Sequence, residues 1–515
     1  MATETLFGED RICGVIAATT AREMWQQLSE AVRHTRTVEL RLDWLRNDRE
    51  LRVFLIRLGR ARFGRRVTLI ATCRRIEAGG NFSKSATRQL AVLRRAIGAG
   101  CRWIDLELES VEGSGGFTRG LCTFGARRIL SFHDFERTPK KSELGRLSRE
   151  LERTARAVGF EAVKIATQCN SIGESLHVLR LARGKRNVIA VPMGEMATPA
   201  RILALREGSA LAYAPVEVAT APGQAPLAEM TELYRAGKLD RQTRVYGVIG
   251  DPIEHSLSPV LHNTAFAARR VNAVYLPFLV RDLDDFVAAI EPLGLQGFSI
   301  TLPHKQRILR HLDDSDPLAA EIGAVNTVVL RGRGKLFGYN TDYVGVLRAL
   351  ERRMPIAGSR ALIVGAGGVA RAVAFALARG GAVVAICARR IERAQKLARA
   401  IHGEAIPRQA LRREFFDAIV NATPVGMHPH TGDSPLEGRE LNCRLVFDTI
   451  YRPQRTKLLQ LAAGRGIETV SGLDMFLAQG IAQWEIWMGE RAPEKTMREA
   501  VVAALRREEK GRGEK

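Results

Sequence analysis

The chain has 515 residues, 46% of them apolar and 26% charged, and 78 lysines and arginines against 56 acidic residues leave a net charge of +22. This composition excludes a disordered or fibrous protein, and the length predicts about three domains, or two if one is a large barrel. Seven cysteines without a C-x-x-C pair argue against a disulfide framework and a structural zinc site. With no signal-peptide pattern and no long apolar stretch, we expect a cytoplasmic protein.

Eight short runs rich in apolar and β-branched residues alternate with helical periodicity over residues 11–217. Eight strand–helix units in succession predict a closed (β/α)8 barrel, with an open doubly wound sheet as the alternative. The runs are 12–17, 37–42, 67–73, 103–108, 128–132, 162–166, 188–191 and 211–216.

The densest positive charge lies in residues 51–100, which hold twelve basic residues and one acid, Glu77. We interpret these as solvated helix faces whose aliphatic stems pack against the surface. The excess charge is spread over both halves of the chain, and no basic motif interleaved with aromatic residues accompanies it. We therefore expect no binding to nucleic acid or membranes, and the sequence leaves the oligomeric state open.

Polar residues interrupt several of the predicted barrel strands. Glu39 and Arg41 alternate in VELRLD, Lys164 lies in AVKIA, and His133 follows another run in SFHDF. A buried ammonium has a lowered pKa and is partly a neutral amine, as a Schiff-base nucleophile requires. A histidine could then move protons. The alternative is that Lys164 extends to solvent from a strand end and that His133 is structural.

Four spaced motifs in this half resemble type I 3-dehydroquinate dehydratase over residues 10–235: ELRLD (39–43), SFHDFERTP (131–139), VKIAT (163–167) and APGQ (221–224). The resemblance implies that Lys164 forms the imine and that His133 is the general acid and base. It also implies a set of substrate-binding residues, namely Glu39, Arg41, Arg74, Arg201, Thr220 and Gln224. Two positions depart from the family: Ala78 stands where it has Glu before Gly-Gly, with Glu77 one residue earlier, and Thr220 replaces Ser.

A polar linker at 236–244 precedes a second α/β pattern with polar turns. Ser256 and Ser258 lie two residues apart and could face one carboxylate, although Ser258 could equally cap a helix beginning near Pro259. Lys305 follows a strand, and Asp342 lies on a later turn. Such a pair suits proton transfer coupled to carbonyl reduction, whereas the alternative is a surface ion pair.

The segment VGAGGVARA fits G-x-G-x-x-A at Gly365, Gly367 and Ala370, after a predicted strand and at the start of a helix. This context is typical of a loop that binds a dinucleotide pyrophosphate. The next strand ends in Arg389 and Arg390 without a carboxylate. Two guanidiniums favour a ribose 2′-phosphate, and hence NADP over NAD, unless the arginines are merely solvent-exposed.

Further motifs extend a resemblance to shikimate dehydrogenase over residues 245–500: NATPVGM (421–427), FDTIYRPQRTKLL (447–459) and GLDMFLAQG (472–480). The resemblance implies that Lys305 and Asp342 form the catalytic pair and that no metal is needed. It places the substrate against Ser256, Ser258, Thr301, Asn326 and Gln479. It places the cofactor against Gly365, Ala366, Gly367, Gly368, Val369, Ala370, Arg389, Arg390, Ala422, Thr423 and Met475.

Together the two resemblances predict a fused enzyme of the shikimate pathway that converts 3-dehydroquinate through 3-dehydroshikimate to shikimate. One alternative is an NAD-dependent quinate or shikimate dehydrogenase with a weakened dehydratase, and another is a catalytically silent metabolite sensor. The expected divisions are a barrel (1–235), a linker (236–244), a substrate-binding domain (245–345), a Rossmann-like NADP-binding domain (346–470), C-terminal helices returning to the substrate domain (471–505) and a charged tail (506–515).

Overall fold

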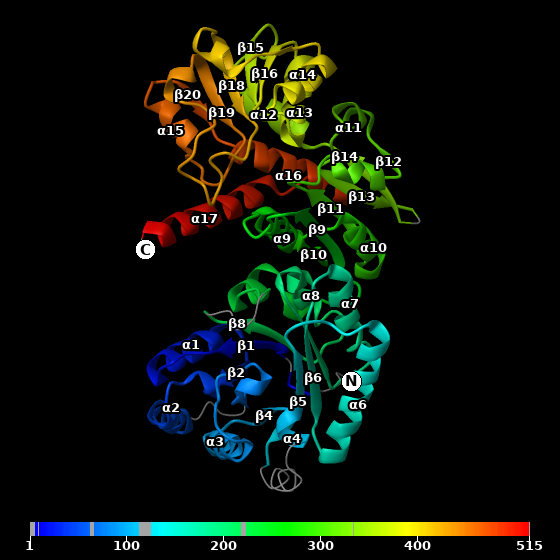
Figure 1. Ribbon diagram of the computed structural model, residues 1–515, viewed down its shortest axis with the longest axis vertical. Helices are drawn as coiled ribbons and strands as arrows, with labels where there is room; N and C mark the ends of the chain where they lie inside the picture. The colour runs from blue at the N-terminus through cyan, green and yellow to red at the C-terminus, as the bar shows by residue number, and fades with distance from the viewer. Residues whose placement is uncertain are drawn as a thin grey trace. The chain divides into compact units, whose positions relative to one another are not determined.

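The computed structural model describes residues 6–8, 10–61, 66–112, 125–217, 223–332 and 334–513. The chain divides into two compact units (Figure 1). Unit 1 comprises Met1–Arg244 with Asn272–Gly294, and unit 2 comprises Val245–Val271 with Leu295–Lys515. Among the described residues, no helix combines the length and apolar character needed to cross a membrane.

Unit 1 is built on eight parallel strands in the order β7-β6-β5-β4-β3-β2-β1-β8. Because β1 pairs with β8 as well as with β2, the sheet curls into a nearly closed barrel, which confirms the predicted fold. The strands are β1 (Ile12–Ile16), β2 (Thr37–Arg41), β3 (Thr68–Thr72), β4 (Trp103–Glu107), β5 (Arg127–Asp134), β6 (Ala162–Gln168), β7 (Val188–Met193) and β8 (Ala212–Pro215).

Helices connect these strands and bury one apolar face against the barrel. In α1, for example, Met24, Leu28 and Ala31 repeat at helical spacing and are buried. The helices are α1 (Ala21–His34), α2 (Asp48–Ala61), α3 (Ala86–Gly98), α4 (Leu108–Glu112), α6 (Lys141–Val158), α7 (Ile172–Arg180) and α8 (Thr198–Leu203). Unit 1 also includes β10 (Ala273–Leu279) and α10 (Leu283–Leu293), whose Asp285 accepts a hydrogen bond from Ile172 N at the start of α7.

The first sheet of unit 2 has its strands in the order β9-β11-β13-β14-β12. Its first two strands are parallel, and β13 is antiparallel to both of its neighbours. The elements are β9 (Arg244–Gly250), α9 (Ser258–Ala268), β11 (Leu295–Ile300), β12 (Asp314–Ser315), α11 (Pro317–Ile322), β13 (Thr327–Arg331) and β14 (Lys335–Tyr339). Leu257, rather than Ser258, is the N-cap of α9.

The second sheet of unit 2 is parallel throughout, in the order β17-β16-β15-β18-β19-β20. The order reverses at β15, and such a switch point forms a ligand-binding crevice. The strands are β15 (Arg360–Val364), β16 (Val383–Cys387), β17 (Glu404–Ala405), β18 (Phe416–Asn421), β19 (Cys443–Asp448) and β20 (Glu468–Val470). The helices are α12 (Asp342–Leu350), α13 (Gly368–Arg379), α14 (Ile391–Ala400), α15 (Lys457–Ala463), α16 (Leu473–Met488) and α17 (Glu494–Gly513).

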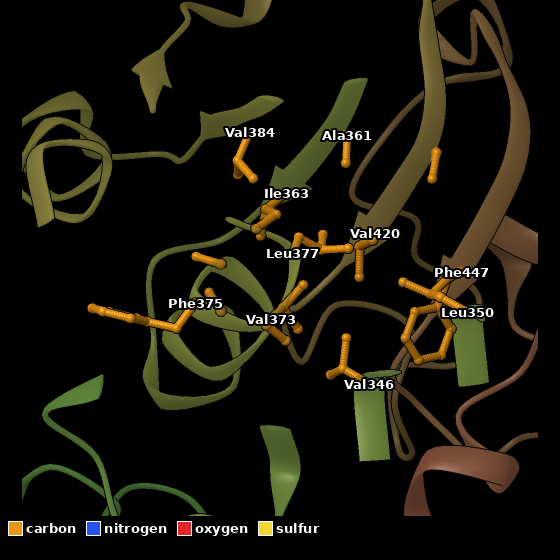
Figure 2. Packing of buried hydrophobic residues seen from close by; sticks show 14 of the residues in the cluster. Val346, Leu350, Ala361, Ile363, Val373, Phe375, Leu377, Val384, Val420 and Phe447 are labelled. Carbon is orange, nitrogen blue, oxygen red and sulfur yellow. The ribbon is translucent and has the colours of Figure 1, made fainter. Parts of the chain in front are cut away.

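The core of this second sheet is centred on α13 (Figure 2). Val373 and Leu377 on the helix pack in one cluster with Ile363, Val420 and Phe447 on the strands. Small residues such as Ala and Val let the helix lie close to the sheet, and this close packing positions its first turn at the crevice.

Candidate active sites

A small cavity of about 70 Å³ lies inside the barrel of unit 1 and is lined largely by the later residues of its strands. It brings together Glu39, Arg41, Arg74, His133, Lys164, Arg201 and Gln224, all of which the sequence predicted. Thr220 lies outside the described residues.

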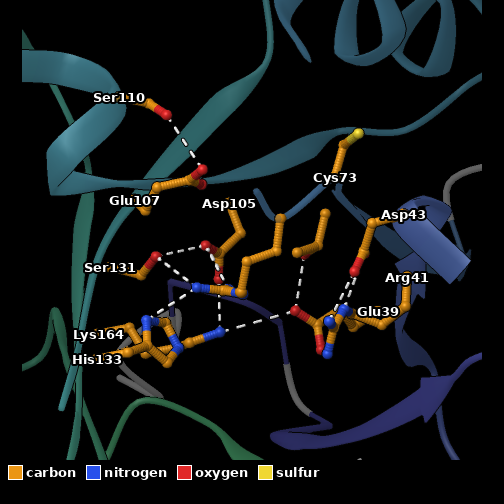
Figure 3. Close-up of polar contacts among 12 residues, drawn as sticks. Glu39, Arg41, Asp43, Cys73, Asp105, Glu107, Ser110, Ser131, His133 and Lys164 are labelled. Atoms are coloured by element: carbon orange, nitrogen blue, oxygen red, sulfur yellow. Dashed lines mark hydrogen bonds and ion pairs between the residues drawn. The ribbon is translucent and has the colours of Figure 1, made fainter. Parts of the chain in front are cut away.

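Lys164 lines this cavity from β6 and is 5% exposed, so its side chain does not extend to solvent. Its Nζ donates to Asp105 Oδ2 at 2.6 Å and lies 3.7 Å from Glu39 Oε1 (Figure 3). The ring of Tyr213 lies on another side, with its centroid 4.6 Å from Nζ. Two carboxylates and an aromatic face therefore surround the ammonium.

Asp105, on β4, is the centre of a network that sequence reasoning missed. Its carboxylate also accepts hydrogen bonds from Arg74 at 3.0 Å and from Ser131 at 2.7 Å. Burial acts to raise the pKa of Asp105, but the charges of Lys164 and Arg74 outweigh it and hold that pKa well below its usual value. Asp105 is therefore a fixed negative charge between Lys164 and Arg74.

His133 lies at the end of β5 with its Nδ1 2.8 Å from an Arg74 guanidinium nitrogen. A guanidinium can only donate, so Nδ1 accepts and the proton of the neutral ring lies on Nε2. Burial, with the charges of Arg74 and Lys164, lowers the pKa of His133 well below its ordinary value. The imidazole is therefore neutral at physiological pH.

The two other predicted arginines differ in their partners. Arg41 makes a bidentate pair with Asp43, through bonds of 3.0 and 2.8 Å. Arg201, on α8, is buried, and among the described residues no carboxylate lies within salt-bridge distance of it; its guanidinium donates to Pro192 O. Burial lowers its pKa to about 10, which still leaves it charged. A buried cation without a protein anion is suited to a ligand carboxylate.

The loop that departs from the family places Glu77 away from the cavity. Glu77 is exposed and pairs with Arg75 at 2.8 Å, whereas Ala78 is buried and Gly79 lines the cavity. Phe135 covers Gly79 so closely that a Cβ there would lie 2.3 Å from its ring. The carboxylate near His133 and Lys164 is therefore supplied by Asp105 and Glu39, not by this loop.

Unit 2 contains a larger cavity of about 560 Å³ with mostly apolar walls. It is lined by nearly all the predicted residues of this half: Ser256, Ser258, Thr301, Lys305, Asn326, Asp342, Gly365, Ala366, Gly367, Gly368, Val369, Arg389, Arg390, Ala422, Thr423, Met475 and Gln479. Ala370 differs, because it is fully buried in the core between α13 and the sheet. Its small side chain serves helix–sheet packing rather than ligand contact.

Lys305 and Asp342 form an ion pair with 2.5 Å between Nζ and Oδ2. The other oxygen of Asp342 accepts from Asn326 Nδ2 at 2.9 Å, and Asn326 also accepts from Thr341 N at 2.7 Å. Asp342 begins α12, where the helix dipole favours a carboxylate. Both groups are largely buried, so this is not a solvent-exposed surface pair.

The glycine-rich loop between β15 and α13 lies against Lys305 of this pair. Gly365 has a φ of +118°, and a Cβ there would lie 2.9 Å from Ala422 O, so the turn requires glycine. Gly367 is the N-cap of α13, whose free N–H groups suit a pyrophosphate. A Cβ at Gly368 would lie 3.0 Å from the Cβ of Lys305, so the loop touches the lysine directly.

Three guanidiniums line the cavity where β16 meets α14: Arg389 and Arg390, which were predicted, and Arg393, which was missed. Arg390 is the N-cap of α14 and Arg393 lies in its first turn. β16 ends at Cys387 and Ala388 follows it, so neither residue at this strand end carries a carboxylate. The residues fit a dinucleotide that carries a 2′-phosphate.

A chain of polar side chains extends from the cavity along α16. Gln483 donates to Gln479 at 2.7 Å, and its other amide atom lies 3.2 Å from His262 Nε2. Gln483 lines the cavity and was also missed. On the cofactor side, buried Asp448 accepts from Asn421, Ile450 N and Thr456, and so holds together loops that line the cavity.

The missed residues left weak signals in the sequence. Asp105 alternates with Glu107 in WIDLELE, and such alternation predicts one polar strand face. Gln483 follows Gln479 by four residues on α16, so the two share a helical face. Arg393 follows Arg389 and Arg390 closely in the sequence, at the start of α14. These spacings could have identified Arg393 and Gln483, but not the partner of Asp105.

Comparison with known proteins matches both halves. Family models match residues 12–240 (type I 3-dehydroquinase), 248–328 (shikimate dehydrogenase substrate binding domain), 348–425 (shikimate / quinate 5-dehydrogenase) and 472–502 (shikimate 5′-dehydrogenase C-terminal domain). The chloroplastic bifunctional 3-dehydroquinate dehydratase/shikimate dehydrogenase of Arabidopsis thaliana is 33% identical, and the match covers 94% of this chain and 83% of that protein.

Further relatives match the second half. The NADP(+) shikimate dehydrogenase of Symbiobacterium thermophilum is 44% identical over 51% of this chain and 95% of its own length. A solved shikimate dehydrogenase of Thermus thermophilus is 36% identical, with a TM-score of 0.47 over 51% of this chain and 99% of that chain.

Proposed function

Since this chain belongs to the bifunctional 3-dehydroquinate dehydratase/shikimate dehydrogenase family, we propose that it catalyses two consecutive reactions. Unit 1 dehydrates 3-dehydroquinate to 3-dehydroshikimate, and unit 2 reduces this ketone to shikimate with NADPH. The observation that carries the proposal is that one chain holds both a buried lysine inside a barrel and a Lys–Asp pair against a glycine-rich loop.

In the dehydratase site, Lys164 is the nucleophile. Its nitrogen adds to the substrate ketone, the ketone oxygen leaves as water, and the resulting imine acidifies the neighbouring carbon. A proton from that carbon and the adjacent hydroxyl then leave as a second water, and hydrolysis of the imine frees Lys164. Asp105 stabilises the positive charge that stays on nitrogen, because it lies 2.6 Å from Nζ.

His133 moves the protons in this sequence. In the ligand-free geometry its Nε2 carries the proton and its Nδ1 is held by Arg74. The neutral ring first accepts the proton of the substrate carbon and then, as imidazolium, donates a proton to the departing hydroxyl, which restores the neutral ring. Arg201 binds the substrate carboxylate as a buried guanidinium. Glu39, Arg41, Arg74, Thr220 and Gln224 are proposed to hold the hydroxyls and close the site.

In the reductase site, NADPH supplies the hydride when it is bound. Lys305, which donates to Asp342 at 2.5 Å, delivers a proton to the oxygen that becomes the alcohol. Asn326 fixes the Asp342 carboxylate through its second oxygen. Ser256 and Ser258 bind the substrate carboxylate, and Thr301 and Gln479 contact ring hydroxyls. Arg389, Arg390 and Arg393 hold the 2′-phosphate.

The remaining sequence-based assignments are also proposals. The functional divisions are those given above, with the dehydratase in 1–235 and the reductase in 245–505. The partners are small anionic substrates, and the compartment is the cytoplasm. The positive charge of the chain suits these substrates, since a basic surface raises the local concentration of anions.

A coupled assay on the whole chain tests the proposal. With 3-dehydroquinate and NADPH, absorbance of the enone should rise and then fall as NADPH is consumed, whereas 3-dehydroquinate alone should stop at the enone. NADH in place of NADPH should support slower reduction. Quinate with NADP serves as a parallel arm, and a chain that oxidises quinate but does not form the enone would contradict the proposal.

A further inference from the structure

Tyr213 is a buried residue of the barrel cavity that the proposed chemistry leaves without a role. It lies on β8, is 7% exposed, and lines the cavity together with Lys164 and Glu39. Its ring faces the Lys164 ammonium. Its hydroxyl has no hydrogen-bond partner among the described residues.

A buried hydroxyl without a partner lowers the stability of the folded protein, because it has given up its hydrogen bonds to water. Phenylalanine would keep the ring, and with it the contact to Lys164, without this cost. The hydroxyl therefore adds nothing to the stability of the barrel, and the ring alone would serve as well. A bound ligand that supplies a hydrogen-bond acceptor would account for such a buried hydroxyl.

The surroundings also determine which kind of partner the hydroxyl can take. Burial, followed by the negative charge of Glu39, raises the pKa of Tyr213 well above its ordinary value. The phenol is therefore a permanent donor at physiological pH. Most donors in this cavity are cationic, namely Lys164, Arg74 and Arg201, while Asp105 and Glu39 accept. His133 and Gln224 are the other neutral groups with N–H donors that line it. A neutral donor suits an uncharged carbonyl or hydroxyl oxygen, which cannot draw a guanidinium from its carboxylate.

We propose that Tyr213 is a substrate-binding residue of the dehydratase site, whose hydroxyl donates a hydrogen bond to an uncharged oxygen of the cyclic hydroxy acid while its ring packs on Lys164. This rests on the proposed function of unit 1. A buried hydrogen bond of this kind discriminates strongly against substrates that lack the matching oxygen.

The variant Tyr213→Phe removes the hydroxyl and keeps the ring. We expect kcat/KM for dehydration to fall about tenfold, as for the loss of one hydrogen bond, with reduction by unit 2 unchanged in the same chain. The unfolding temperature should stay equal or rise, because the ligand-free protein loses only an unpartnered group. Tyr234→Phe is the matched control, since Tyr234 is buried in unit 1 but does not line the cavity.

Two results would overturn the proposal. Full kcat/KM in Tyr213→Phe would show that the hydroxyl does not meet the substrate. A lower unfolding temperature with unchanged dehydration would show that the hydroxyl has a structural partner instead. A substrate analogue lacking the bound oxygen should react equally with both proteins, which identifies that oxygen.

A binding experiment separates this proposal from the proposed function. In a Lys164→Ala background no imine can form, so calorimetric titration with 3-dehydroquinate measures binding alone. Adding Tyr213→Phe should weaken that binding about tenfold, and equal binding would refute the role of Tyr213. Absence of dehydration by the unaltered chain would instead refute the proposed function, whatever the titration shows.

Discussion

The barrel cavity of unit 1 is lined by a dense network of charged groups, whereas the larger cavity of unit 2 has mostly apolar walls around the Lys305–Asp342 pair and three arginines. In the barrel, Asp105 joins Lys164, Arg74 and Ser131 in one network. In unit 2, Lys305 and Asp342 pair with each other, and Asn326 supports them. The first arrangement suits a covalent step with a charged intermediate, and the second suits a single proton delivered beside a bound dinucleotide.

The largest expected effect separates the two sites completely. Lys164→Ala should abolish dehydration, because no other amine lines the barrel cavity among the described residues, and should leave reduction of 3-dehydroshikimate unchanged. Borohydride trapping of substrate, read by mass spectrometry, should disappear with it. Lys185→Ala is the control, since Lys185 pairs with Glu152 elsewhere in the barrel. Trapping that persists in Lys164→Ala would remove Lys164 from its role.

Substitutions at the ion pair of unit 2 should impair reduction and leave dehydration unchanged. Lys305→Met should reduce the rate of ketone reduction about 10²- to 10⁴-fold, the usual contribution of a proton-transfer group. Asp342→Asn should act in the same direction, because it breaks the 2.5 Å pair. Steady-state kinetics on both substrates measures this. Dehydration that falls in parallel would mean that the variants disturb folding rather than proton delivery.

A smaller effect is expected on cofactor choice. Arg393→Gln should raise KM for NADPH about tenfold or more through loss of a charge-assisted hydrogen bond, with KM for NADH unchanged. Arg389→Gln should behave in the same way. Arg399→Gln, exposed in the last turn of the same helix, is the control. Equal increases for both cofactors would place these arginines away from the 2′-phosphate.

The two units should also differ in their response to acid. In unit 1, Asp105 and His133 both have lowered pKa values. The unfolded chain therefore binds more protons than the folded one as the pH falls, and stability is lost from about pH 6.5 downward. In unit 2, burial lowers the pKa of His262 to about 3 and raises that of Asp448 to about 6.

As the pH falls, His262 and Asp448 change the stability of unit 2 in opposite directions. The contribution of His262 to the free energy of unfolding is lost as the pH falls below about 6.5. The contribution of Asp448 is instead lost as the pH rises from about 4 through 6. We expect acid incubation followed by assay at neutral pH to inactivate the dehydratase before the reductase. Asp448→Asn should steepen the acid loss of reductase. Simultaneous loss of both activities in the unaltered chain would contradict this difference.

The smallest effect concerns the displaced carboxylate. Glu77→Gln should leave dehydration within about twofold of the parent, because Glu77 is exposed and pairs with Arg75 outside the cavity. The measurement is kcat/KM for 3-dehydroquinate. A tenfold loss would mean that Glu77 enters the site when substrate binds.

Much of both sites could be predicted from the sequence because their motifs are local. The turn after β15 needs Gly365 for its backbone conformation, and the strand ends follow from apolar runs. The partner of Lys164 could not be predicted, since Asp105 lies 59 residues earlier and meets it only when β4 and β6 take their places in the barrel. Nor does the sequence alone show that Glu77 faces outward, because the two neighbouring glycines allow several turns.

The close approach of Gly368 to Lys305 limits how the second half of the chain can change. Any side chain added at residue 368 would push on the Cβ of Lys305 before it met a ligand. A larger residue in the glycine-rich loop would therefore displace Lys305, the residue proposed to deliver the proton. We therefore expect a redesign of cofactor preference to succeed at Arg389, Arg390 and Arg393, which also line the cavity, with glycine kept at residue 368.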